Sequence, residues 1–170
     1  VRSSAASDVY KRQPIEAMRI LQNVSTHCYL LESAQANEAW GRYTFLGYDP
    51  KLEINCIDGH MKLGKLSVET ENPSEYIRQI LSEYKSPKFD YLPSFTGGLV
   101  GYFSYDYLGY KEKCIRGKAR DTEDFKDVDL MLFDKVIAFD NLCQKIILIA
   151  NMSLDAPETG YNLSLIHISE

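Results

Sequence analysis

The sequence is poor in the residues from which most catalytic and metal sites are built. It has three histidines and four cysteines among 170 residues, and no two cysteines form a C-x-x-C pair. No Ser-His-Asp set and no metal site follows from their spacing. We therefore predict no catalytic residue and no metal ligand in this chain. We expect its cysteines to be free thiols in a reducing, cytoplasmic compartment.

Positive charge and long apolar runs are also scarce. The net charge is −5 and the pI is about 5.3, which argues against a nucleic acid or an anionic membrane surface as a partner. No run approaches the roughly 18 consecutive apolar residues of a membrane-spanning helix. We expect no nucleic acid and no membrane among the partners of this chain.

What the sequence does contain is a series of short apolar stretches separated by turn residues. Alternation of apolar and polar residues predicts strands, and apolar spacing of three to four residues predicts helices. We expect a helix over 14–21, strands over 27–32, 40–48, 51–57 and 60–63, a helix from 73 to before Pro87, a strand from Leu99, one long central strand over 129–140 and a last strand over 145–151. This order predicts an α+β fold, a mainly antiparallel β-sheet covered by a few helices.

Two local signals are specific. Asp58-Gly59 between alternating stretches is typical of a two-residue hairpin turn. Asn72, followed by Pro73 and by a glutamate three residues on, is typical of a helix start. That helix carries an apolar stripe, which we expect to lie on the sheet: Tyr76, Ile77, Ile80, Leu81 and Tyr84. Replacing Leu81 by Asp is then expected to bury an unpaired charge at a cost of several kcal/mol.

The stretch 92–106 combines three glycines, Gly97, Gly98 and Gly101, with several aromatic rings. Glycine weakens a strand unless the backbone or a ligand must approach closely there. Alternation from Leu99 onward predicts a central strand that is entered through a tight glycine turn. A packed core strand with a bulge explains the same residues without any functional role.

Polar residues gather where two predicted strands end and begin. Glu32 and Ser33 end one strand, and Gly41, Arg42 and Tyr43 open the next. If these strands pair, the five residues meet at one end of the sheet, where Arg42 can bind a carboxylate and Glu32 can hold an ammonium group. The set then suits a free amino acid, with Tyr43 beside its side chain. The alternative is a surface ion pair between Glu32 and Arg42, with Ser33 capping a loop.

Three segments resemble anthranilate synthase component I. They are Leu30-Leu31-Glu32-Ser33, Gly41-Arg42-Tyr43, and the stretch 97–106, which is similar to a GG-x-VGY-x-x-YD motif of that family. The resemblance runs from about Pro14 to Asn162 and implies the fold of the family's amino-terminal domain. It also implies that Leu31, Glu32 and Ser33 belong to an allosteric site for L-tryptophan. A related family, aminodeoxychorismate synthase component I, holds tryptophan too, and that comparison adds Gly41, Arg42 and Tyr43 to the site.

The same resemblance implies what a parent enzyme does. Members of the family are lyases that convert chorismate to anthranilate in tryptophan biosynthesis, using Mg²⁺ and ammonia from a glutamine amidotransferase subunit (component II). In the family, chorismate and Mg²⁺ bind in the carboxy-terminal half, where a Pro-Tyr-Met segment completes the tryptophan pocket. This sequence contains neither that chorismate-binding half nor that segment. We therefore expect the chain alone to be inactive, to hold no cofactor and to carry part of the feedback site.

The two ends do not continue the pattern of the rest. Residues 1–13 have no apolar period, and residues 163–170 follow a polar stretch with no connection to it. Both resemble translated sequencing adapters, so we expect them to be non-native or disordered, and residues 14–162 to be part of a longer protein. Two other interpretations stay open. One is the same region of aminodeoxychorismate synthase component I, in folate synthesis; the other is a non-enzymatic amino-acid-binding module.

Overall fold

The computed structural model describes residues 4–32, 41–112 and 125–153, and the chain divides into two units. The first unit contains residues 1–49, 90–97 and 134–170, and the second contains residues 50–89 and 98–133. Each unit has its own antiparallel sheet. The predicted class, mainly antiparallel sheet with few helices, is confirmed, although the expected single sheet is in fact two.

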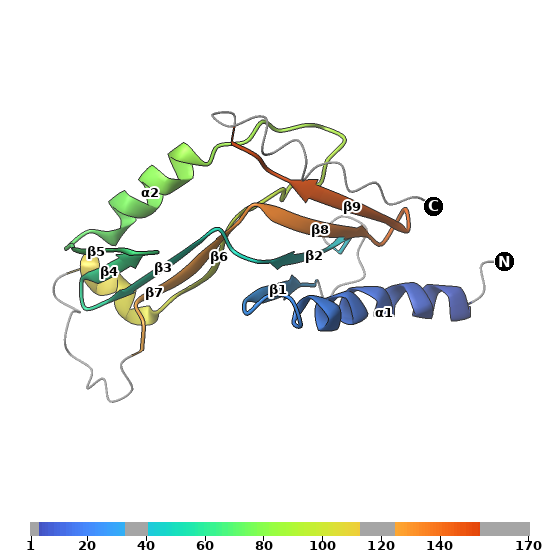
Figure 1. Ribbon diagram of the computed structural model, residues 1–170, viewed down its shortest axis with the longest axis horizontal. Coiled ribbons are helices and arrows are strands. Elements are labelled where there is room, and N and C mark those ends of the chain that lie inside the picture. Colours follow the sequence, from blue (N-terminus) through green and yellow to red (C-terminus); the bar gives the residue numbers. More distant parts are fainter. Residues whose placement is uncertain (1–3, 33–40, 113–124, 154–170) are drawn as a thin grey trace. The chain divides into compact units, whose positions relative to one another are not determined.

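The first unit is built on a four-stranded sheet in the order β1–β2–β8–β9 (Figure 1). Its strands are β1 (Cys28–Leu31), β2 (Tyr43–Tyr48), β8 (Lys135–Asp140) and β9 (Lys145–Ala150). Helix α1 (Ser4–Leu21) lies along β1 and β2. Leu46 of β2 and Phe139 of β8 are 0% and 1% exposed, so the two middle strands supply the core of this unit.

The second unit is built on a five-stranded sheet in the order β5–β4–β3–β7–β6. Its elements are β3 (Leu52–Ile57), β4 (His60–Leu63), β5 (Leu66–Glu69), α2 (Pro73–Glu83), β6 (Gly98–Phe103), the 3₁₀ helix η1 (Tyr105–Tyr110) and β7 (Val128–Phe133). Ile54 and Cys56 are fully buried, as their alternation predicts, and Ile77 and Ile80 of α2 belong to the same core cluster. The apolar side of α2 therefore contributes to the core of this unit.

The predicted hairpin turn at Asp58-Gly59 is confirmed. Asp58 and Gly59 have φ of +48° and +82°, the left-handed values that a primed two-residue turn requires. They join β3 and β4, and Ile57 pairs with His60 across the turn. Residues 141–144, which the sequence also predicts to be a short hairpin loop, join β8 and β9 through a longer connection. Short-range turn chemistry therefore fixes the register of the β3–β4 hairpin.

The predicted long strand over 129–140 is wrong in one respect, because it is two strands. Residue Asp134 separates β7, which pairs with β3 and β6, from β8, which pairs with β2 and β9. Both strands are central in their own sheets, as predicted for a stretch that is apolar on both faces. The apolar pattern runs through the change of sheet without interruption, so periodicity alone does not reveal it.

The glycine-rich stretch forms β6, but its predicted central position is wrong. Within the described residues β6 pairs with β7 and lies at an edge of the five-stranded sheet. The φ values of Gly97, Gly98 and Gly101 are +141°, +140° and +154°, a backbone conformation that side chains disfavour. The three glycines therefore allow the backbone at the sheet edge to adopt these positive φ values. The strand also ends at Phe103, and Tyr105 lies in η1.

The helices differ from the prediction in detail. Helix α1 begins at Ser4, so Pro14 is inside it and not in its first turn as expected. Asn72 precedes α2 as predicted, but its side chain makes no capping bond to the helix backbone. Leu81 is 46% exposed, so the expectation that Leu81→Asp would bury a charge is wrong. Strand β5 was not predicted, because its residues are mostly exposed and show little alternation.

The structure bears on two further expectations, one about the cysteines and one about membrane-spanning helices. Cys28, Cys56 and Cys143 are free thiols, as expected, while Cys114 lies outside the described residues. None of the described helices combines the length and the apolar character that a membrane span needs. Residues 34–38, which are small and polar and predict a loop, also lie outside the described residues. So does most of 111–127, a charged stretch that predicts an exposed connection.

Candidate functional site

The first strand pairing brings most of the predicted site residues to one end of the four-stranded sheet. Strands β1 and β2 are antiparallel, with Leu31 opposite Phe45. The end of β1 therefore lies beside the start of β2, as predicted. Glu32 follows directly after β1 and is exposed, and Tyr43 is the first residue of β2. Ser33 lies outside the described residues.

A row of aromatic rings begins at this end of the sheet. The ring centroids of Tyr43 and Phe45 are 5.8 Å apart, those of Phe45 and Phe95 are 5.5 Å apart, and those of Phe95 and Tyr29 are 6.4 Å apart. The side chains at 43 and 45 project to the same face because residues two apart in a strand do so. All four residues are intermediate in exposure, although the Tyr29 hydroxyl is buried, and Leu31, opposite Phe45, is 47% exposed. The row therefore offers a partly open apolar surface.

Arg42 adds a cation at the start of this row. Its guanidinium carbon lies 4.9 Å from the centroid of the Tyr43 ring, within the range of a cation–π contact. The side chain of Arg42 is 39% exposed. The sheet end therefore presents a guanidinium group beside an apolar aromatic surface, and the carboxylate of Glu32 comes from the neighbouring strand end.

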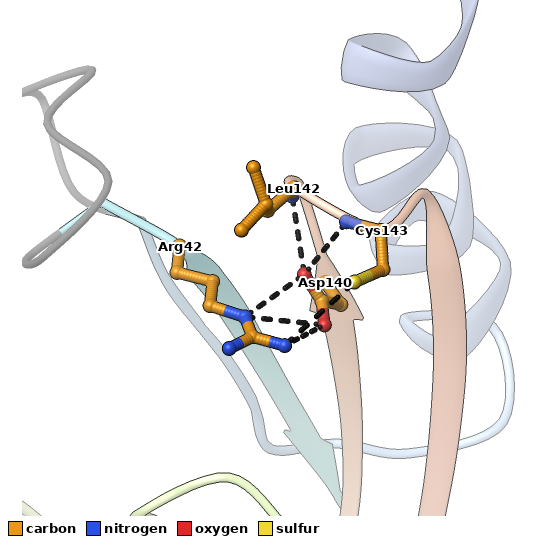
Figure 2. A network of polar contacts seen from close by, with 4 residues as sticks. All are labelled: Arg42, Asp140, Leu142 and Cys143. Carbon is orange, nitrogen blue, oxygen red and sulfur yellow. Dashed lines mark hydrogen bonds and ion pairs between the residues drawn. The ribbon is translucent and has the colours of Figure 1, made fainter.

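The guanidinium is held by a carboxylate from a third strand. Arg42 donates from Nε to both oxygens of Asp140, at 3.2 Å each, and from Nη2 to Oδ2 at 2.7 Å (Figure 2). Oδ1 of Asp140 also accepts hydrogen bonds from the backbone nitrogens of Leu142, at 3.1 Å, and Cys143, at 3.0 Å. The Asp140 side chain is only 4% exposed. This buried charge is fully paired, which is the condition for burying a carboxylate at low cost.

The ion pair shifts the pKa of both Asp140 and Arg42. The hydrogen bond from Arg42 lowers the pKa of Asp140 to about 2, and the hydrogen bond to Asp140 raises the pKa of Arg42 above its ordinary value. Both groups therefore stay charged at neutral pH. A guanidinium has two edges that can grip a carboxylate. Asp140 uses the Nε–Nη2 edge, and Nη2 also makes a long contact of 3.8 Å to Sγ of Cys143. Nη1 is therefore the nitrogen best placed for another carboxylate, and Figure 2 shows it on the side away from Asp140.

The chemistry of this arrangement favours binding over catalysis. A guanidinium edge, an exposed carboxylate and an aromatic surface match the carboxylate, the ammonium group and the side chain of an aromatic amino acid. Among the described residues, no group of three or more His, Cys, Asp or Glu side chains is placed to hold a metal ion. The described part of the chain therefore offers a candidate site for a zwitterionic ligand.

The predicted site residues differ in the contacts that the structure gives them. Gly41 lies beside Arg42 at the start of β2, and its carbonyl oxygen accepts a bond of 3.4 Å from Nδ2 of Asn141. The alternative of an ion pair between Glu32 and Arg42 is not formed in the described chain, because Arg42 pairs with Asp140. Sequence reasoning missed Asp140 and Phe95. Asp140 ends an apolar strand, a position that could have drawn attention, whereas nothing in the sequence links Phe95 to this sheet.

Similar proteins are found among the curated sequences and among the solved structures. No protein-family model matches the chain. Anthranilate synthase component 1 of Pseudomonas aeruginosa is 38% identical over 124 residues, which is 69% of this chain and 25% of that protein. Anthranilate synthase alpha subunit 2, chloroplastic, of Oryza sativa subsp. japonica is 34% identical over 164 residues, 86% of this chain and 27% of that protein.

A solved structure gives the same result. The crystal structure of anthranilate synthase component I from Streptococcus pneumoniae matches with a TM-score of 0.57 and 26% identity, over 81% of this chain and 30% of that one. The chain spans about a quarter of the length of the curated relatives it matches. Over that length, the chain belongs to the anthranilate synthase component I family and corresponds to the amino-terminal region of those proteins.

Proposed function

We propose that this chain is the regulatory part of an anthranilate synthase component I and that its four-stranded sheet binds L-tryptophan. The observation that carries the proposal is the placement of Arg42, with Nη1 turned away from Asp140, at the start of the aromatic row of Tyr43 and Phe45. The family gives this placement a physiological ligand, because tryptophan is the end product of the pathway that anthranilate feeds. The ligand residues are Leu31, Glu32, Ser33, Gly41, Arg42 and Tyr43.

Each part of tryptophan has a matching group at the site. The carboxylate binds to the guanidinium of Arg42 through Nη1, and the ammonium group binds to Glu32 and Ser33. The indole ring lies against Tyr43 and Leu31, where each aromatic pair contributes about 0.5–1.5 kcal/mol beyond the area that it buries. Tyrosine or phenylalanine would make the same polar contacts with a smaller ring, so tryptophan is preferred through its buried area.

In the parent enzyme the site acts by coupling. The parent is a cytoplasmic lyase that converts chorismate to anthranilate, with Mg²⁺ and with ammonia from its glutamine amidotransferase partner, component II. Chorismate and Mg²⁺ bind in the remaining three quarters of the parent, so the present chain alone is inactive. Tryptophan favours a state of the parent that binds chorismate less tightly, and by thermodynamic reciprocity chorismate weakens the binding of tryptophan by the same factor.

The proposal is tested by feedback inhibition in a full-length parent that carries this segment. Ser33→Ala and Arg42→Lys are expected to raise the tryptophan concentration that halves activity by about tenfold. The first removes a hydrogen bond to the charged ligand, and the second replaces the planar guanidinium with an ammonium group of different shape. Uninhibited turnover should change little, because neither residue belongs to the chorismate-binding part. Ser67→Ala on the exposed strand β5 is the control. Unchanged inhibition in both Ser33→Ala and Arg42→Lys would remove the site assignment.

A further inference from the structure

We propose that Asp140 is a positioning residue for the ligand's carboxylate and that the β8–β9 turn, residues 141–144, is part of the amino-acid site. Asp140 acts through Arg42: it holds Nε and Nη2 of the guanidinium and thereby aims Nη1 at the ligand. The inference rests on the proposed function, because it concerns the carboxylate of the same ligand.

The first argument is that one turn holds Arg42 from two directions. The Asp140 carboxylate grips the guanidinium through three contacts between 2.7 and 3.2 Å. The backbone nitrogen of the next residue, Asn141, donates a bond of 2.8 Å to the carbonyl oxygen of Arg42. The backbone and the head group of Arg42 are thus both tied to the end of β8, so the long side chain between them has little freedom left.

The second argument is that Asp140 is itself held in place. Its Oδ1 accepts the backbone N–H groups of Leu142 and Cys143, so the carboxylate cannot rotate without breaking the turn. The plane of the Arg42 guanidinium is fixed further by the Tyr43 ring, 4.9 Å away. A pre-oriented donor loses less conformational entropy when a ligand binds, which is the usual source of gain from a supporting residue.

The third argument separates positioning from simple stabilisation of the turn. The turn needs an acceptor at Oδ1, which an asparagine at position 140 also supplies. The contacts of Asp140 with the guanidinium require a negative charge and two acceptor oxygens, which asparagine lacks. Asp140→Asn therefore keeps the turn and releases Arg42, so the two roles can be measured apart.

The test uses this 170-residue chain and two probes, L-tryptophan and tryptamine, which lacks the carboxylate. Affinities in the millimolar range are measured by NMR titration. Asp140→Asn is expected to weaken L-tryptophan about tenfold and to change tryptamine less than about twofold, because the loss is confined to carboxylate recognition. In an Arg42→Lys background, Asp140→Asn should cause no further loss, since Asp140 acts only through Arg42.

The matched control breaks another ion pair of the same sheet. Lys135 donates a hydrogen bond to Asp49 next to the opposite end of β2, and Asp49→Asn should leave the affinities for both probes unchanged. If Asp140→Asn does not fold, Asp140→Glu replaces it; the longer side chain displaces the guanidinium, and the same selective loss is expected. Amide spectra of each variant establish that the fold is kept.

Three results would overturn the inference. An equal loss for both probes shows that Asp140 only stabilises the turn, and no loss for either probe shows that it does not position Arg42. A further loss from Asp140→Asn in the Arg42→Lys background shows that it acts by another route. Failure of the wild-type chain to bind L-tryptophan more tightly than tryptamine is a different outcome, because it refutes the proposed function itself.

Discussion

Gly101 of β6 lies so close to β7 that a Cβ atom added to it would stand 2.0 Å from the carbonyl oxygen of Asp129. Its φ is +154°, which side chains rarely adopt. The strand cannot yield, because Gly101 pairs with Leu130 in the middle of the β6–β7 ladder. Backbone packing in the second unit therefore explains the glycine at position 101 of the stretch 97–106.

Gly101→Ala is expected to destabilise the second unit by at least about 2 kcal/mol, because both the φ angle and the backbone contact must change. The measurement is the urea midpoint of the whole chain. Gly64→Ala is the matched control, since its φ of +59° is also left-handed but its added Cβ would meet only the end of the Leu52 side chain at 3.1 Å. A cost for Gly101→Ala no greater than that of Gly64→Ala would contradict the packing argument.

Tyr110→Phe is expected to cost about 1–3 kcal/mol, the penalty for leaving buried hydrogen-bonding groups unpaired. The Tyr110 hydroxyl accepts from the backbone nitrogen of Gly59 at 2.7 Å and donates to Oδ2 of Asp127 at 2.6 Å. It thus ties η1 to the β3–β4 hairpin and to the start of β7. Urea unfolding measures the cost.

Tyr107→Phe serves as the control for Tyr110→Phe. The Tyr107 ring packs 5.7 Å from the Tyr110 ring, so the change alters a neighbouring tyrosine without removing the buried bonds. It should cost less than about 0.5 kcal/mol. Equal effects of the two changes would show that the Tyr110 hydroxyl contributes nothing specific.

The ion pair of Asp140 and Arg42 predicts a pH dependence of stability in the first unit. The pKa of Asp140 is lowered from 3.8 to about 2 in the folded chain. A lowered carboxyl pKa means that the unfolded chain binds protons first as the pH falls. The contribution of the pair is therefore complete above about pH 4 and is lost as the pH falls toward 2.

The measurement is the free energy of unfolding of wild type and Asp140→Asn between pH 2 and 7. The difference between the two proteins should be constant above pH 4 and should shrink below it, since protonated Asp140 resembles asparagine. A difference that stays the same down to pH 2 would be inconsistent with the paired carboxylate.

Local chemistry made part of this fold predictable. Asp58-Gly59 specified a hairpin because its two residues suit left-handed angles, and Ile54 and Cys56 were placed inward by alternation. The change of sheet at Asp134 could not be predicted, because β7 and β8 are both buried on two faces and read as one strand. Leu81 was wrongly predicted to be buried. It borders the buried residues of α2, and the apolar spacing alone does not show which residues at the edge of the stripe are exposed.

The candidate site, like the fold, could be predicted only in part from the sequence. The placement of the end of β1 beside the start of β2 followed from pairing two neighbouring strands, which is a short-range inference. Asp140 was missed because it reaches Arg42 only through the pairing of β2 with β8, across 98 positions of sequence. Phe95 enters the first unit through a short segment, 90–97, between two parts of the second unit. Such long-range placement requires the topology, which residue patterns did not provide.

The central claim is that one end of the four-stranded sheet binds L-tryptophan, and amide NMR shifts of the chain during a titration test it most directly. We expect saturable shifts at Leu31, Arg42, Tyr43 and Phe45, and none along β5 in the second unit. Tryptamine should perturb Tyr43 and Phe45 while leaving Arg42 nearly unchanged, since it lacks the carboxylate. Shifts that are absent at millimolar L-tryptophan, or that appear only away from these residues, would contradict the account.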